Sequence, residues 1–555
     1  MPISPSYPGI YIQELLSSSH TIVPAPTSIA AFVGYSHPYQ TKTPFGQAQQ
    51  LFSFTDYQTY FGGLFSSGLT DASLPRAVYQ FFLNGGSTAW VVGLQPGLFD
   101  GTGAIVTRLG PGGVYPTYFV ETDSASNGLL FSALQPIDAV SMTVSVTNIR
   151  NAKTTFDVIV TYGTQVETYR GITLPVGATP KPTDPDAMIN SVSHLVSVAP
   201  PSGGNFGATI SGPPSSSVLW TDVTASSVVK GAAKPYSTGY SAVDFLGNTS
   251  APGVFEPSSA LDNLEIFNLL LIPGITDNAV VSAALAFAER KRAFAILDPP
   301  PQATATAAIA TTAIPTPPQP IVAWMTGLPG GTYELPTSQN GALYFPYLMS
   351  TDPVTNAPIP VAPSGFVAGV YAATDANRGV WKAPAGLATT VLNTLGPVPS
   401  GVMNDPQQGV LNLDSINCLR SFSGVGTVVW GARTLVANNS AYQQSMYVPV
   451  RRMTLFIEQT LLANLRWVVF EPNDEPLWIA ITSSINAFLL SLFRQGALQG
   501  STPSEAFQVK CDSTTTTPDN QAQGIVNIFV AFAPLKPAEF VIIQIAQLAG
   551  QTAGS

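Results

Sequence analysis

The stretch IFNLLLIPGITDNAVVSAALAFAERKRAFAIL, residues 266–297, decides the fold class of this 555-residue chain. It begins with the apolar run 266–272, continues through a helical pattern over 278–292 and returns to an apolar run at 293–297. Two short buried strands joined by a helix are typical of a βαβ unit with parallel strands. The sequence therefore predicts an α/β layer.

A second succession of strand, helix and strand lies near the start of the chain. Ile29–Gly34 and Ala89–Gly93 are predicted buried strands, and apolar residues at helical spacing over Leu74–Asn84 predict a helix between them. Another helix is expected to begin after Ser53 or Thr55, either of which could serve as its N-cap. The first hundred residues thus also predict an α/β layer.

The character of the sequence changes between residues 101 and 250, where alternating apolar and polar runs are punctuated by Gly, Pro and Ser. This pattern predicts a mainly β insertion. Beyond residue 400 we expect a strand at 425–430, a helical stripe over 450–461, a strand at 466–470, a second helical stripe over 478–492, and late strands near 505–511, 525–533 and 538–546. The fold class is therefore a multidomain combination of α/β and α+β parts.

We divide the chain accordingly. The division is an N-terminal arm 1–20, a central α/β domain 21–100 plus 251–395, an inserted β-rich domain 101–250, a C-terminal α+β domain 396–537 and a C-terminal arm 538–555.

Composition excludes some classes of function. Lys and Arg number 22 against 32 Asp and Glu, and the net charge is −10, so a broad phosphate-binding surface is not expected and nucleic acid is not an expected partner. Charged residues make up 10% of the chain, so most of the surface must be uncharged polar groups. The N-terminus has no basic region of the kind that secretory signals carry. The apolar stretch 476–493 is interrupted by Ser, Thr and Asn, and we interpret it as a largely buried helix and expect no membrane insertion.

Residues with catalytic or metal-binding chemistry are sparse. The three histidines, His20, His37 and His194, all lie in the first 194 residues, without a neighbouring Cys, Asp or Glu at metal-ligand spacing. The chain has no GxSxG and no Walker sequence, and Cys418 and Cys511 are expected to be reduced buried thiols. We therefore expect no catalytic residues, metal or cofactor. The acidic residues at 471–475 are interpreted as helix capping.

Both termini carry short, strand-forming segments. Residues 9–15 form a β-prone run behind a proline, in a region too sparse in apolar residues for a folded unit. At the other end, residues 541, 543 and 545 alternate with 540, 542 and 544, and both sets are largely apolar. Such a segment is either an inserted strand in another molecule or a strand packed within its own subunit.

Several blocks of the sequence resemble contractile tail sheath proteins, over roughly 1–100 and 255–555. These blocks are Tyr7–Glu14, Thr27–Gly34, Phe54–Gly63, Phe81–Gly86, Ala368–Pro384, Val428–Leu435, Val450–Arg452, Phe456–Glu458, Trp467–Glu475 and Phe507–Asp512. The resemblance implies a central domain of subtilisin-like fold without the protease site, and an insertion at 101–250 that faces outward. The chain has no histidine after residue 194, which agrees with that implication.

The resemblance also implies a function. A sheath subunit polymerises helically around an inner tube and shortens on triggering, so that the tube is driven through a target envelope. Strands exchanged between subunits would link the polymer, because an edge strand offers unpaired N–H and C=O groups to an incoming strand. The expected linking residues are Tyr7, Gly9, Ile10, Tyr11, Ile12 and Glu14 in the N-terminal arm, and Phe540, Val541, Ile542, Ile543 and Ile545 in the C-terminal arm.

The family places the C-terminal domain innermost, against the tube. The candidate tube contacts are Ser483, Asn486, Arg494, Gln495 and Gln499. Expected partners are further copies of the chain, the inner tube protein, baseplate and tail terminator or cap proteins, and sheath paralogues. Such particles, which are phage tails, pyocin-like particles or extracellular injection systems, assemble in the bacterial cytoplasm. The alternatives are a β-rich surface or S-layer-type protein and, least favoured, a subtilisin-like or hydrolase-like enzyme.

Overall fold

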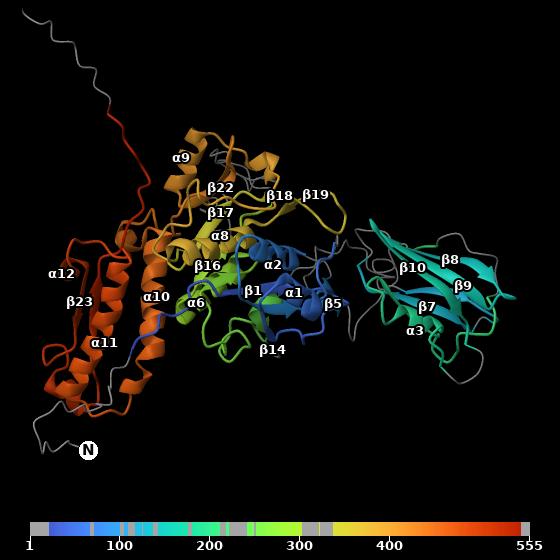
Figure 1. Cartoon of the computed structure of the whole chain (residues 1–555), viewed down its shortest axis with the longest axis horizontal. Helices are drawn as coiled ribbons and strands as arrows, with labels where there is room; N and C mark the ends of the chain where they lie inside the picture. The colour runs from blue at the N-terminus through green and yellow to red at the C-terminus, as the bar shows by residue number, and fades with distance from the viewer. Residues whose placement is uncertain are drawn as a thin grey trace, which may run out of the picture. The chain divides into compact units, whose positions relative to one another are not determined.

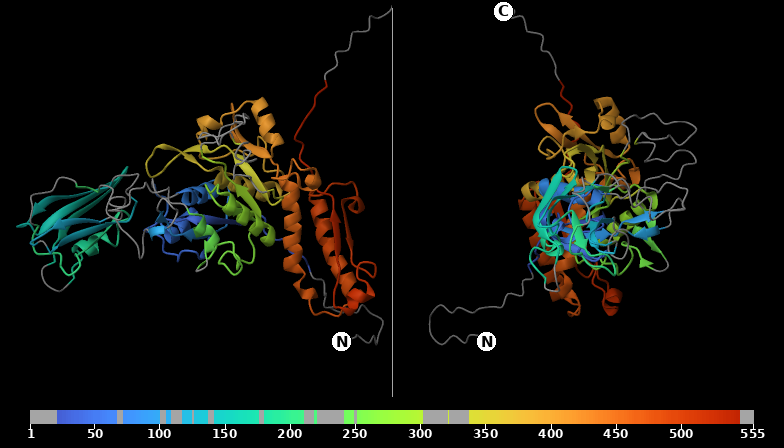
Figure 2. Two further views of the ribbon diagram at one scale, coloured as in Figure 1. Left: turned by 180° about the vertical axis from the view of Figure 1, so that it is seen from behind. Right: turned by 90° about the vertical axis from the view of Figure 1, so that its right-hand side faces the viewer.

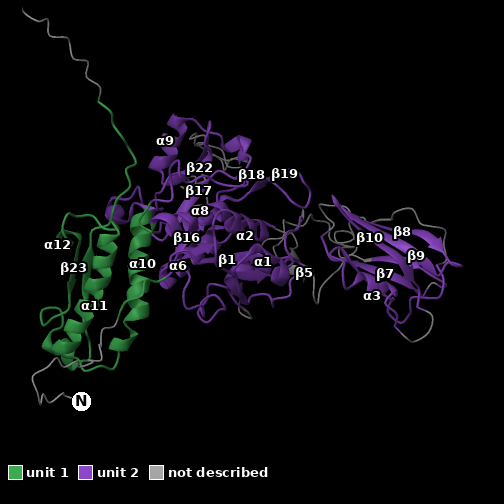
Figure 3. Ribbon diagram, in the orientation of Figure 1, with its two compact units in different colours: residues 1–25, 379–382, 449–555 green, residues 26–378, 383–448 purple. Residues whose placement is uncertain are grey.

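The computed structural model describes residues 21–66, 72–99, 105–108, 117–124, 126–136, 142–175, 180–210, 218–220, 241–248, 251–301, 321 and 337–544. The chain divides into two compact units (Figure 3). The first, the C-terminal unit, comprises residues 1–25, 379–382 and 449–555, and the second, the main unit, comprises 26–378 and 383–448. The C-terminal unit is thus assembled from three separate segments of the sequence.

The main unit is built on an eight-stranded mixed sheet (Figure 1). Its strands, in spatial order, are β2 (Ala48–Leu51), β3 (Ala89–Leu94), β1 (Ala30–Tyr35), β15 (Leu269–Leu271), β16 (Phe294–Leu297), β17 (Gly341–Phe345), β21 (Ile416–Phe422) and β22 (Gly426–Trp430). The six inner strands are parallel and the strand at each edge is antiparallel to its neighbour. This arrangement confirms the α/β layer predicted from both ends of the central domain.

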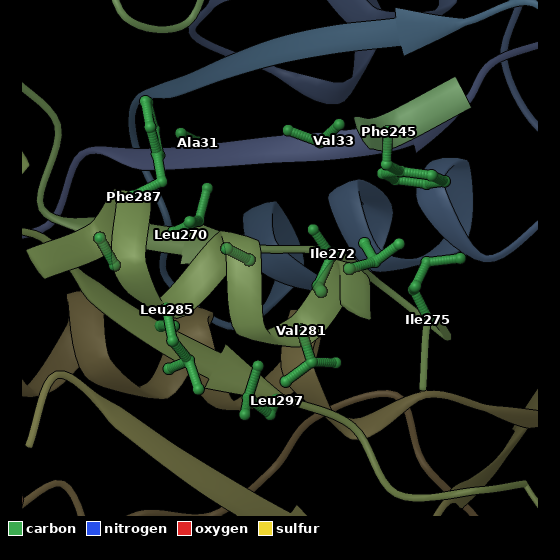
Figure 4. Packing of buried hydrophobic residues seen from close by; sticks show 14 of the residues in the cluster. Ala31, Val33, Phe245, Leu270, Ile272, Ile275, Val281, Leu285, Phe287 and Leu297 are labelled. Atoms are coloured by element: carbon green, nitrogen blue, oxygen red, sulfur yellow. The ribbon is translucent and has the colours of Figure 1, made fainter. Parts of the chain in front are cut away.

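Helices cover both faces of this sheet, because side chains on a strand alternate between its two faces. Ala31 and Val33 of β1 lie in one buried cluster with α6 (Asn278–Lys291), as Figure 4 shows for Val281, Leu285 and Phe287. Helix α6 begins where the Asp277 carboxylate accepts hydrogen bonds from the N–H groups of Ala279 and Val280. The helix and its flanking strands match the predicted βαβ unit.

The opposite face is covered by α2 (Ser73–Leu83) and α8 (Pro363–Arg378). Phe32 of β1 meets Phe81 of α2 edge to face at 5.4 Å between ring centroids. The two helices approach closely because α8 carries Gly365, where an added Cβ would lie 2.4 Å from the carbonyl oxygen of Ala77. Any larger residue at this position would force the helices apart.

Shorter elements complete the main unit. Ser53 caps α1 (Phe54–Phe61) by accepting the N–H of Asp56, as predicted. The remaining elements, of which the first two close the stretch 101–250, are α5 (Ala242–Leu246), β13 (Gly247–Asn248), β14 (Ala251–Pro252), β18 (Leu348–Thr351), β19 (Pro358–Val361), β20 (Gly396–Pro397), η1 (Pro399–Gly401), α9 (Asp405–Leu413) and η2 (Ser440–Ser445).

The insertion is mainly β, as expected. Its larger sheets are β10-β9-β8-β12 and β11-β7-β6, whose described pairings are antiparallel. The elements are β4 (Gly97–Phe99), β5 (Ile105–Arg108), β6 (Thr117–Glu121), β7 (Gly128–Ala133), β8 (Met142–Arg150), β9 (Thr155–Tyr162), β10 (Gln165–Thr173), α3 (Pro185–Ile189), β11 (Val196–Ala199) and β12 (Val218–Trp220).

The insertion shares buried residues with the rest of the main unit. Val354, from the connection between β18 and β19, is 4% exposed within the hydrophobic cluster of the insertion, and Leu64 packs against the same cluster. The His37 imidazole accepts N–H groups at Nδ1, so its Nε2 carries the proton and donates to Gln135 Oε1 at 2.9 Å. Gln40 donates to the carbonyl oxygen of His194. The insertion is therefore joined to the main unit by a common core as well as by its two chain connections.

The C-terminal unit packs two long helices against a small sheet. Its elements are α10 (Val448–Asn464), η3 (Arg466–Val468), α11 (Glu475–Arg494), α12 (Pro503–Ala506), β23 (Phe507–Lys510), α13 (Pro518–Ala522) and β24 (Phe529–Phe532). Their shared core also takes in Ile22, Val380 and Trp381 from the two shorter segments of the unit. Helix α11 is long and apolar enough to cross a membrane by length and composition, but its apolar side is buried in this core.

Two predicted strands of this unit are not observed: residues 466–470 form none, and neither do the described residues 538–544 of the strand expected near 538–546. Residues 466–470 were expected to form a strand, but Arg466–Val468 is a single 3-10 turn and Phe470 has a left-handed backbone with φ of 73°. The chain must reverse between the end of α10 and the start of α11 within ten residues, which an extended segment could not do. Apolar composition alone suggested a strand where the connection required a turn.

Candidate assembly surface on the C-terminal unit

The sheet of the C-terminal unit has one apolar face and one mixed face. Strands β23 and β24 pair antiparallel, with Phe507 opposite Phe532 and Val509 opposite Val530. These four side chains pack against the core that α11 supplies. The other face carries Gln508, Lys510, Phe529 and Ala531, of which Phe529 is 51% exposed. The sheet therefore packs its apolar face against the core of α11 and exposes its mixed face.

Both strands of this sheet lie at an edge. In the described residues each has a single strand partner. Just beyond β24 the chain also contacts the segment after α11, where Gln499 donates its N–H to the carbonyl oxygen of Ala533 at 2.9 Å and Leu498 forms an isolated bridge with Pro534. An edge strand presents a row of backbone donors and acceptors to any further strand that arrives. A two-stranded sheet is also marginal by itself, so that additional strands would stabilise it.

The C-terminal segment leaves the unit beside the end of α11. An isolated bridge joins Leu498 to Pro534, after which the chain extends away (Figure 2). Exposure is high at each of four consecutive apolar residues, namely Phe540 (73%), Val541 (80%), Ile542 (85%) and Ile543 (78%). None of the four belongs to a strand, and Ile545 lies outside the described residues.

The N-terminal arm residues Tyr7, Gly9, Ile10, Tyr11, Ile12 and Glu14 also lie outside the described residues. The described chain enters the C-terminal unit at Ile22, which is 7% exposed in its core. Val23 is held by the Asn464 side chain, which accepts its N–H at 2.9 Å and donates to its carbonyl oxygen at 2.8 Å. Val23 therefore lies close to the end of α10.

Helix α11 exposes an uncharged face. Asp474 caps the helix by accepting the N–H of Leu477, which confirms the capping role expected for the acidic cluster. Of the candidate tube contacts, Ser483, Arg494, Gln495 and Gln499 are exposed and Asn486 is half-buried. No charged residue occurs between Glu475 and Arg494, so the exposed side of the helix between them consists of uncharged groups, which include Ile479 (61% exposed).

A second feature of the surface, Phe470, was missed by the sequence analysis. Its side chain is 103% exposed, and its backbone φ of 73° is an outlier for a bulky residue. The loop that carries it is held at its base by Asn473, which accepts from Trp478 Nε1 at 2.9 Å and donates to the carbonyl oxygen of Ile525 at 3.1 Å. No sequence signal distinguishes Phe470 from the apolar residues before it.

The titratable groups are tuned by burial. Burial raises the pKa of Cys418 to about 12 and also raises that of Cys511, so both thiols stay protonated and unreactive at neutral pH. Burial lowers the pKa of His37 to about 4, against the effect of its hydrogen bond to Gln135. Among the described residues, no group of three or more His, Cys, Asp or Glu side chains is placed to hold a metal ion.

Two sequence families match the chain in succession. The family described as the phage tail sheath protein central domain matches residues 256–435, and the phage tail sheath C-terminal domain matches residues 441–547. Together they cover just over half of the chain.

Individual proteins give the same result. A prophage major tail sheath protein of Pseudomonas aeruginosa is 28% identical over 301 residues, which are 53% of this chain and 69% of the relative. The tail sheath protein of Burkholderia phage BcepMu is 27% identical over 272 residues, 47% of this chain and 54% of that protein. The contracted sheath of the extracellular contractile injection system PVC has a similar fold, with a TM-score of 0.54 at 20% identity over 98% of this chain and 99% of the other.

Proposed function

Because the chain belongs to the contractile tail sheath family and is a structural subunit of a contractile sheath, we propose that strands exchanged between its copies hold that sheath together. The observation that carries the proposal is the pairing of two incomplete features on one unit. One is a sheet whose two strands pair, within the described part of the chain, only with each other, and the other is the exposed apolar segment 540–543, which belongs to no strand. The sheet has backbone groups that a further strand could pair with, and the segment has apolar side chains that pairing with a sheet could bury.

The donated strand satisfies both chemical needs. Its backbone pairs with an edge of β23 or β24, and its apolar side chains leave water, since Phe540 to Ile543 are more than two-thirds exposed in the single subunit. Residues 7–14 supply a second donated strand in the same way. A subunit that gives strands to its neighbours and receives theirs remains linked to them while the lattice shortens and widens.

Contraction needs no nucleotide in this proposal. The extended lattice is metastable, and the baseplate releases its stored free energy. The central domain is subtilisin-like in fold and has no protease function, and the insertion 101–250 faces outward. The C-terminal unit lies against the inner tube, with the uncharged exposed face of α11 as the contact. The particle assembles in the bacterial cytoplasm with an inner tube protein, a baseplate, a terminator or cap protein and sheath paralogues.

Electron microscopy of the purified chain tests the proposal. We expect hollow cylinders of uniform diameter whose formation depends on residues 538–555. The matched control is a chain that ends at Gly550, which keeps every large apolar residue of the arm. A chain that lacks the arm and still forms stable cylinders would contradict strand exchange through the C-terminus.

A further inference from the structure

Phe470 combines two features that do not favour the isolated subunit. A bulky side chain with positive φ is strained, and such strain persists where the surrounding structure enforces it and function uses it. The side chain is also fully exposed, so it gains nothing from burial within its own chain. Aromatic side chains of this kind supply much of the binding free energy in protein interfaces once they are desolvated.

Hydrogen bonds at Asn473 fix the base of the loop that carries Phe470. Asn473 connects it both to Trp478 in the first turn of α11 and to the carbonyl oxygen of Ile525. The backbone carbonyl of Asn473 also accepts a hydrogen bond from Gln521. A ring presented on a braced loop loses little conformational freedom on binding, which is the property expected of an anchor in an interface.

Phe470 and the C-terminal segment lie at opposite ends of helix α11, which indicates the kind of partner that Phe470 contacts. The loop precedes the first turn of α11, whereas the C-terminal segment departs beside Leu498, just beyond the last turn of that helix. Helix α11 has 20 residues and is therefore about 30 Å long. Figure 1 shows the segment leaving at the end of the unit opposite to the connection between α10 and α11.

We propose that Phe470 is the anchor on which the C-terminal arm of a second copy docks. A helical polymer needs heterologous contacts, in which one end of a subunit meets the other end of the next. The C-terminal arm leaves from one end and Phe470 lies at the other, so a head-to-tail arrangement brings them together. At the other terminus, Val23 bonds to Asn464 and so lies at the same end as Phe470, which does not meet this condition. The inference rests on the proposed strand exchange and adds the site at which the arm docks.

The chemistry of the two surfaces is complementary. Phe470 and Val469 (62% exposed) form an apolar projection, and the arm offers four exposed apolar residues in succession without a charge. Phe529, exposed on the outer face of β24, follows the Ile525 turn to which the loop is fixed. An arm lying along the free edge of the sheet would thus end against the Phe470 ring.

Photocrosslinking tests the docking site directly. The full-length chain is prepared with photoreactive benzoylphenylalanine in place of Phe470, assembled from a mixture of isotopically light and heavy subunits, and irradiated. We expect crosslinked peptides from residues 538–555 that join light to heavy chains, and none in unassembled protein. Crosslinks to residues 1–20, to the same chain, to another region or to nothing in assembled cylinders would overturn the proposal. If the unsubstituted chain forms no cylinders, the proposed strand exchange fails first.

A substitution at Phe470 distinguishes a role in assembly from a role in the stability of the subunit. Phe470→Gly relieves the backbone strain, so the isolated subunit should melt at the same or a higher temperature, while its critical concentration for assembly rises at least tenfold. Phe52→Ala is the matched control, because Phe52 is 63% exposed and lies in the main unit. Unchanged assembly by the Phe470→Gly chain, or a melting temperature that falls together with assembly, would overturn the proposal.

Discussion

A chain truncated after Pro537 should keep its fold and lose its polymer. Fully burying a side chain such as Phe, Val or Ile stabilises a protein by about 1.5–3 kcal/mol. Phe540, Val541, Ile542 and Ile543 are 73–85% exposed in the subunit, so only about a fifth of that burial is present in the isolated chain. The four residues therefore contribute about 1–2 kcal/mol to the stability of the single subunit.

The same side chains matter far more to the assembled state. If only two of them become fully buried in a neighbour, the remaining four fifths of their burial contributes about 2.4 kcal/mol to association at the lower end of the range, so removing them weakens association about fiftyfold. The measurements are a chemical denaturation curve of the dilute subunit and the concentration at which sedimentable polymer first appears. The chain that ends at Gly550 serves as control. A truncated subunit that unfolds much more easily, or that aggregates without cylinders, would show that the segment belongs to its own fold and refute the reasoning.

Three further predictions concern the main unit. The pKa of His37 is about 4 in the folded chain and about 6.5 in the unfolded chain, so as the pH falls the unfolded state is protonated first. The free energy of unfolding should therefore fall by about 2 kcal/mol between pH 7.5 and pH 5. Denaturation curves should show that His37→Gln removes this part of the pH dependence, and an unchanged slope would contradict it. Gly365→Ala should destabilise the main unit by about 1–3 kcal/mol, because the added Cβ would lie 2.4 Å from the Ala77 backbone. Gly409→Ala in α9 should stabilise the unit by roughly 0.5–1 kcal/mol, because no atom lies within 4 Å of the added Cβ. Thermal melts of the two variants measure this difference in sign. Excision of residues 101–250 should yield a chain that aggregates, because Val354 and Leu64 would become exposed to water. Adding Val354→Thr and Leu64→Gln should restore a soluble chain that forms cylinders. If sedimentation shows that the excised chain is equally soluble without those two changes, the shared core is unimportant.

The elements that sequence predicted well are those with strong local signals. Helix α6 follows from apolar residues at helical spacing between two buried strands, and the cap of α11 follows from the acidic residue Asp474 before a helical stripe. The β character of the insertion follows from alternation along its strands. Each of these depends on residues close together in the chain.

The features that sequence did not predict depend on residues far apart. His37 and Gln135 are separated by 98 positions, and Val354 enters the core of an insertion that ended about a hundred residues earlier. Phe470 was predicted as part of a strand because Val468, Val469 and Phe470 are apolar, yet the connection between two antiparallel helices forces a turn there. Periodicity cannot reveal such positions, since their environment is set by tertiary packing.

The segmented construction of the C-terminal unit has a mechanical consequence. Its three segments mean that the backbone crosses between the two units four times, at residues 25–26, 378–379, 382–383 and 448–449. A pull on the C-terminal arm is therefore shared by several covalent crossings instead of passing through a single linker. Cleavage of any one crossing would leave the units connected by the other three, so a break in one of them would not by itself detach the C-terminal unit from the main unit.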